Sequence, residues 1–118
     1  MSTLAVLFSA PSGIKSTSEM PLNWKPEPKT RAEILAIIAE LFPGLSEFKD
    51  NAIYFNNSTI EIDLWQIGLK GIIVLQSGES LDSFVIRRYS EEVIKPLCKR
   101  LGWRATGGSS GDFIDNSF

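Results

Sequence analysis

The sequence has no histidine and a single cysteine, Cys98. Without histidine, Ser-His-Asp and Cys-His catalysis, imidazole acid–base chemistry and histidine-ligated zinc are excluded. One thiol supplies neither a four-cysteine zinc site nor a CxxC redox pair, and it cannot form an internal disulfide. We therefore expect no metal and no cofactor, and a reducing compartment, the cytoplasm.

Long apolar runs and a basic charge balance are also missing. The longest apolar runs, Leu4–Phe8 and Ile72–Leu75, are far shorter than the roughly 20 residues of a membrane-spanning helix. The N-terminus does not have the pattern of a secretory signal. The formal net charge of −2 removes the broad positive field that attracts nucleic acids. We expect neither a membrane nor a nucleic acid as a partner.

The periodicity of the remaining residues predicts one domain, residues 1–118, of the α+β class. Patterns typical of strands occur at 3–8, 52–55, 59–65, 71–76, 83–88, 103–106 and 112–115. Helical stripes follow Thr30 and Ser90. Because strand follows strand without crossover helices, we predict an antiparallel β-sheet of about five to six strands with two helices packed on one face.

Local signals set the expected helix boundaries. Thr30 and Glu33 form a capping box that begins the first helix. Ser90 can cap the second helix, and Pro96 is expected to bend or delay it. The segment 81–89 fits a helical stripe as well as a strand, so both structures stay open there.

Two segments lack regular patterns. Residues 15–29 contain three prolines around Trp24, which predicts an extended strap that the indole holds in place. Residues 107–111 read Gly-Gly-Ser-Ser-Gly. These letters match a nucleophile elbow, but the general-base histidine is absent, so we predict a plain Gly/Ser loop.

Alternation along 59–65 places Glu61, Asp63 and Trp65 on one face of a strand, opposite Ile60 and Ile62. Two carboxylates about 6–7 Å apart could perform acid–base or glycosidase chemistry. Acidic residues that alternate along an antiparallel strand are more often a solvated sheet face. Exposed aromatic residues are enriched in binding surfaces. We therefore predict binding residues at Glu61, Asp63 and Trp65 and no catalytic residue.

The other tryptophans, Trp24 and Trp103, are expected to anchor the strap and the core. Basic residues gather around the second helix and could bind an acidic partner, or only balance the charge at the helix end. They are Arg87, Arg88, Lys95, Lys99, Arg100 and Arg104.

Three stretches carry a resemblance to known sequences. They are Trp24-Lys25-Pro26, the helix from Arg31-Ala32-Glu33-Ile34 to Leu41-Phe42-Pro43, and Leu101-Gly102-Trp103-Arg104-Ala105 before Gly111-Asp112-Phe113-Ile114-Asp115. Together they resemble a group of small uncharacterised single-domain bacterial proteins. The resemblance implies a one-domain bacterial protein and no particular activity.

Two hypotheses for the function remain. The first is a small non-enzymatic protein-binding module, an immunity-like or accessory protein, whose partner is another protein; a homodimer is the alternative partner. The second is a small-molecule-binding or carboxylate-based enzyme domain with a pocket between the sheet and the helices.

Overall fold

The computed structural model describes residues 4–47, 53–56, 59–76, 78–107 and 111–114. The strands are β1 (Leu4–Phe8), β2 (Lys29–Thr30), β3 (Ile53–Asn56), β4 (Thr59–Asp63), β5 (Ile72–Leu75), β6 (Ser80–Leu81), β7 (Ser83–Arg87) and β8 (Arg104–Gly107). The helices are η1 (Thr17–Glu19), α1 (Arg31–Leu41), α2 (Gly44–Glu47), η2 (Leu64–Ile67) and α4 (Glu91–Leu101).

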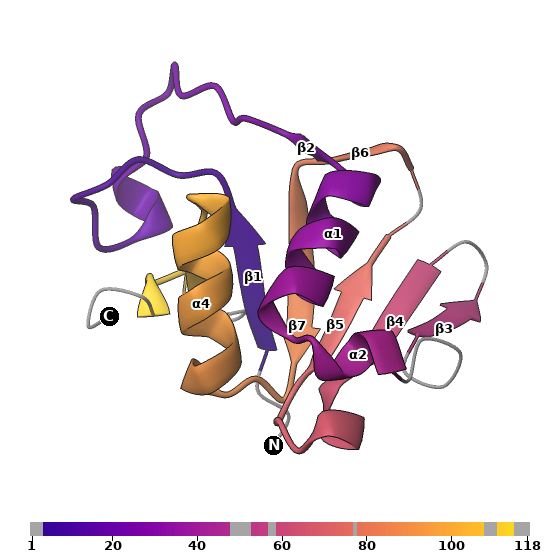
Figure 1. Ribbon diagram of the computed structural model, residues 1–118. Helices are drawn as coiled ribbons and strands as arrows, with labels where there is room; N and C mark the ends of the chain where they lie inside the picture. Colours follow the sequence, from indigo (N-terminus) through magenta and orange to yellow (C-terminus); the bar gives the residue numbers. More distant parts are fainter. Residues whose placement is uncertain (1–3, 48–52, 57–58, 77, 108–110, 115–118) are drawn as a thin grey trace.

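Six strands form one antiparallel sheet in the order β3-β4-β5-β7-β1-β8, and β2 pairs with β6 beside it. The N-terminal strand β1 therefore lies between β7 and β8, which come from the second half of the chain (Figure 1). The predicted α+β fold is confirmed. Within the segment left open at 81–89, Ser83–Arg87 form the strand β7, whose Phe84 and Ile86 face the core with period two.

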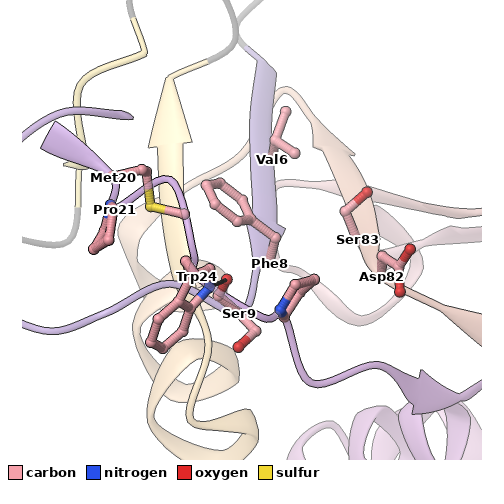
Figure 2. A pocket seen from close by; sticks show the side chains of 9 residues that line it. Val6, Phe8, Ser9, Met20, Pro21, Trp24, Asp82 and Ser83 are labelled. Atoms are coloured by element: carbon pink, nitrogen blue, oxygen red, sulfur yellow. Dashed lines mark hydrogen bonds between the residues drawn. The ribbon is translucent and has the colours of Figure 1, made fainter. Parts of the chain in front are cut away.

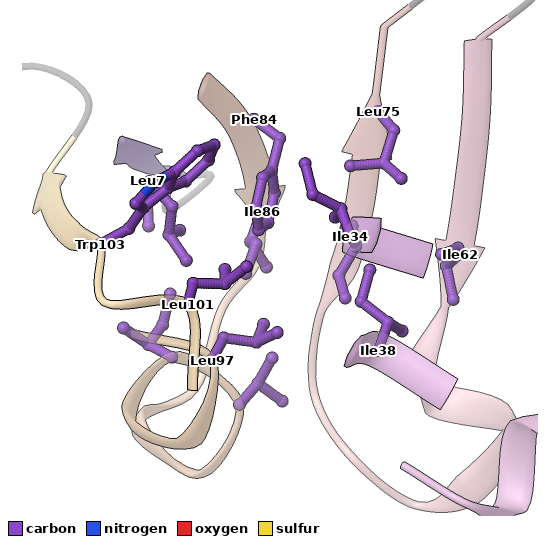
Figure 3. Close-up of a cluster of buried hydrophobic side chains, with 14 of the residues drawn as sticks. Leu7, Ile34, Ile38, Ile62, Leu75, Phe84, Ile86, Leu97, Leu101 and Trp103 are labelled. Carbon is purple, nitrogen blue, oxygen red and sulfur yellow. The ribbon is translucent and has the colours of Figure 1, made fainter. Parts of the chain in front are cut away.

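Both α1 and α4 pack on the same face of this sheet (Figure 1). Alternate residues of β1, β4, β5 and β7 meet the apolar faces of the helices there (Figure 3). The largest side chains in this core are fully buried: Phe84, Leu7, Ile34, Ile38, Ile62, Leu64, Ile73, Leu75, Ile86, Ile94, Leu97 and Val93. We call the opposite face of the sheet the outer face.

The helix ends follow the sequence signals only in part. At α1, Thr30 Oγ1 accepts from the Glu33 amide at 3.1 Å and Glu33 Oε2 accepts from the Thr30 amide at 3.2 Å, which confirms the capping box. At α4, Ser90 occupies the N-cap position, but its hydroxyl donates to the Lys70 carbonyl instead of capping. The expected delay at Pro96 is wrong, because α4 begins at Glu91 and continues through the proline.

The strand predicted over 59–65 ends two residues early. The Asp63 carboxylate accepts from the Trp65 amide at 2.9 Å and starts the short helix η2. Trp65 therefore does not continue the alternation of β4, and its predicted place on the strand face is wrong. The strand predicted at 112–115 is reduced to isolated bridges at Asp112 and Phe113, and Asp115 lies outside the described residues.

The proline-rich segment 15–29 is the strap that the sequence predicts. Trp24 Nε1 donates to the carbonyl of Ser9 at 3.0 Å, so the indole holds the strap against the end of β1. The segment also contains η1, which Ser16 and Glu19 cap in both directions. Most of the predicted Gly/Ser loop, residues 108–110, lies outside the described residues.

Candidate functional site

The two predicted carboxylates lie on the outer face, but each is engaged in a structural contact. Glu61 Oε1 accepts from Arg87 Nη2 at 2.7 Å, across the intervening strand β5. Asp63 accepts the amide of Trp65. A pair of carboxylates that shares one substrate therefore has no support in this arrangement, because each already has a partner of its own.

Trp65 follows these carboxylates in η2, and half of its side chain (50%) is exposed. Trp65 thus lies two residues after Asp63, in η2 and not on the strand. Of the other tryptophans, Trp103 is buried in the core against Phe84 and Trp24 holds the strap, as predicted.

The outer face is mostly apolar over the three strands β5, β7 and β1. Val6 lies opposite Val85, and Val85 lies opposite Val74, so three valines form one row across the strands. Ile72 and Leu4 flank Arg87 in the next row. These apolar side chains are partly exposed, and Leu4 reaches 37%. We call the five residues Leu4, Val6, Ile72, Val74 and Val85 the apolar patch.

Sequence reasoning missed the apolar patch, although a signal for it was present. A strand with one solvated face alternates between apolar and polar residues, whereas a strand covered on both faces is apolar throughout. The continuous runs Leu4–Phe8 and Ile72–Leu75 are of the second kind. Among the described helices, α1 and α4 cover only the inner face.

One end of the outer face is covered by the strap and by the chain near the C-terminus. Arg104 Nη1 donates to the carbonyls of Pro11 at 2.9 Å and Ile14 at 2.8 Å. Its guanidinium also lies over the ring of Phe113, 3.9 Å from the centroid, and Phe113 in turn packs against Phe8. These contacts bring together residues from the two ends of the chain.

The basic residues predicted around the second helix do not form one binding patch. Arg87 pairs with Glu61 on the outer face, and Arg100 pairs with Glu40 of α1 at 3.1 Å. Arg104 binds backbone carbonyls beneath the strap. Three of the six predicted basic residues therefore already have acceptors within the domain.

A pocket of about 430 Å³ opens where the strap crosses the outer face (Figure 2). We call it the strap pocket. The pocket expected from the sequence was between the sheet and the helices, whereas the strap pocket lies on the opposite face. Its walls are Val6, Phe8, Ser9, Met20, Pro21, Trp24, Pro26, Asp82 and Ser83.

The described part of the chain offers neither a metal site nor a membrane-spanning helix. No group of three or more cysteine, aspartate or glutamate residues is arranged there to hold a metal ion. None of the described helices has the length and apolar character needed to span a membrane. Comparison with protein-family models, curated proteins and solved structures found no match. The resemblance to small bacterial proteins therefore stays a prediction.

Proposed function

We propose that this chain is a small non-enzymatic protein-binding module, and that its partner protein covers the apolar patch of the outer face. The observation that carries the proposal is the apolar row across β7 and its two neighbours. Contiguous apolar surface of this kind is typical of interaction sites on folded domains. An accessory or immunity-like role would use such a surface.

The size of the patch indicates what the partner must contact. Strands lie about 4.8 Å apart and rise about 3.3 Å per residue, so the patch is roughly 10–15 Å across. That is the size of the hydrophobic centre of an interface, which usually buries about 800 Å² on each partner. The polar rim would then include Glu61, Asp63 and Arg87, and the exposed Trp65 would extend it.

The charges on this rim favour a different protein over a second copy. Glu61 and Arg87 neutralise each other, whereas Asp63 adds a negative charge at the end of β4. Two copies packed through this face would bring their acidic residues together, in a chain whose net charge is already −2. A partner with an apolar centre and a basic rim would fit better.

The test is a charge placed at the centre of the patch. Val85→Lys should weaken partner binding more than about tenfold, because a charged side chain would be buried without a partner at the centre of the interface. The unfolding free energy should change by less than about 1 kcal/mol, because Val85 faces outward. Ala36→Lys, on the exposed side of α1, is the matched control.

The measurement has two steps. Light scattering on the isolated protein, across a wide range of concentrations, first determines whether it self-associates. Proteins captured from a lysate are then purified and their dissociation constants measured with wild type, Val85→Lys, Ala36→Lys and Trp65→Ala. A partner that binds Val85→Lys as tightly as wild type, or a homodimer that Val85→Lys dissolves, would contradict the proposal.

A further inference from the structure

We propose that the strap pocket binds an apolar group that carries a positive charge, such as an aromatic or long-chain amine. This inference does not rest on the proposed protein partner, because the strap pocket has its own lining and shares only Val6 with the apolar patch. The volume of about 430 Å³ lies within the range of small-molecule sites, roughly 300–1,000 Å³.

The walls of the strap pocket come from three parts of the chain that are tied together. Phe8 and Val6 project from β1, and Trp24 of the strap lines the pocket together with them (Figure 2). The bond from the Trp24 indole to Ser9 fixes the ring, and the Trp24 amide donates to the Pro21 carbonyl at 3.1 Å. A ligand would therefore meet walls that are already ordered.

The far end of the strap is also held. Lys29 pairs with Leu81 and Thr30 pairs with Ser80, in the short ladder of β2 and β6. This ladder places the strap next to Asp82, which directly follows β6. The position of Asp82 relative to the aromatic wall of the pocket is therefore set by the fold. The strap pocket is thus part of the fold.

The lining determines the charge of the ligand. Asp82 is the charged residue among those that line the strap pocket, and its side chain is exposed at the rim. The indole N–H of Trp24 already donates to the Ser9 carbonyl, so it is not a donor for a ligand, and the aromatic rings of Trp24 and Phe8 remain as lining. A cation is attracted both by an aromatic face and by a carboxylate, whereas an anion would be repelled by Asp82. Lys25 is exposed and does not line the strap pocket.

The experiment uses three probes of similar size and different charge: phenethylamine, phenethyl alcohol and hydrocinnamate. Each is titrated into the labelled protein, and the indole N–H signal of Trp24 is followed by NMR. The amine should bind about two- to fivefold more tightly than the alcohol, the gain expected from one exposed ion pair or one cation–π contact. The anion should bind most weakly.

Two variants then identify the source of this preference. Asp82→Asn should reduce the preference for the amine over the alcohol, whereas Glu79→Gln removes the same charge from a side chain outside the lining and should have no effect. A capped Phe-Lys dipeptide, compared with phenethylamine, shows whether the cation comes from a peptide side chain or from a free amine. Equal binding of amine and alcohol, an unaltered preference in Asp82→Asn, or shifts that spare Trp24 would overturn the proposal.

Discussion

Replacing Arg104 with lysine is expected to loosen the strap while leaving the sheet and helices intact. The arginine joins three segments: it donates to the carbonyls of Pro11 and Ile14 and lies over the ring of Phe113. Lysine keeps the positive charge and most of the aliphatic stem. It lacks the planar fork that reaches two carbonyls while stacking on a ring.

The expected magnitude follows from these contacts. A hydrogen bond to a charged group contributes about 1.5–3 kcal/mol, and a cation–π contact about 0.5–1 kcal/mol at an exposed site. Lysine can keep the hydrogen bond to one carbonyl but loses the other bond and the stacking on Phe113. Because Arg104 is only partly buried, solvent reduces the contribution of these contacts. We therefore expect the free energy of unfolding to fall by about 1–3 kcal/mol. With a urea dependence of about 1–3 kcal/mol per molar, the midpoint should fall by roughly 1 M.

Urea unfolding measures this loss, and hydrogen exchange locates it. In Arg104→Lys, exchange should accelerate at the amides that join the strap to the chain near the C-terminus, Thr17 to Gly111 and Phe113 to Lys15. The amides of α1 should change little. Arg100→Lys is the matched control, because its ion pair with Glu40 is exposed and should contribute less than about 1 kcal/mol. If Arg104→Lys behaved like this control, Arg104 would not hold the strap.

The two long helices give two further tests by urea unfolding. Thr30→Ala should lower the free energy of unfolding by about 1 kcal/mol, because the Glu33 amide loses its acceptor. Thr30→Ser should retain most of the stability. Equal stability of wild type and both variants would contradict the capping box. Pro96→Ala should raise the free energy of unfolding by about 1–2 kcal/mol. Removing a proline from within a helix gains about 3 kcal/mol, and part of this gain is lost because the unfolded chain becomes more flexible. A loss of stability would show that packing of the proline ring dominates.

The parts of the fold that the sequence predicted are those with local causes. The capping box at Thr30 needs only residues three positions apart. The alternation of buried residues in β4 and β7 likewise lies within a single strand. Short-range periodicity was therefore sufficient for the α+β class and for most element types, but it left residues 81–89 open between strand and helix.

The candidate site was predicted less well, because it depends on contacts between distant parts of the chain. Alternation alone cannot show that Asp63 turns to cap η2, which removes Trp65 from the strand. Nor can it show that Glu61 meets Arg87 across β5, since that pairing requires the strand order. Arg104 was grouped with the basic residues around the second helix for the same reason: its acceptors, Pro11 and Ile14, are about ninety residues away in the chain.

The apolar runs of β1 and β5 connect the sequence to both proposals. Their inner side chains pack under α1 and α4, whereas their outer side chains divide into two parts. At one end, the strap covers Phe8 and leaves the strap pocket; along the rest, the apolar patch is partly exposed among the described residues. A partner protein bound to the patch would cover the part of the outer face that the strap leaves exposed. Because Val6 belongs to the patch and also lines the strap pocket, a ligand in the pocket and a protein on the patch would meet at this valine. Binding of one should therefore alter the affinity for the other.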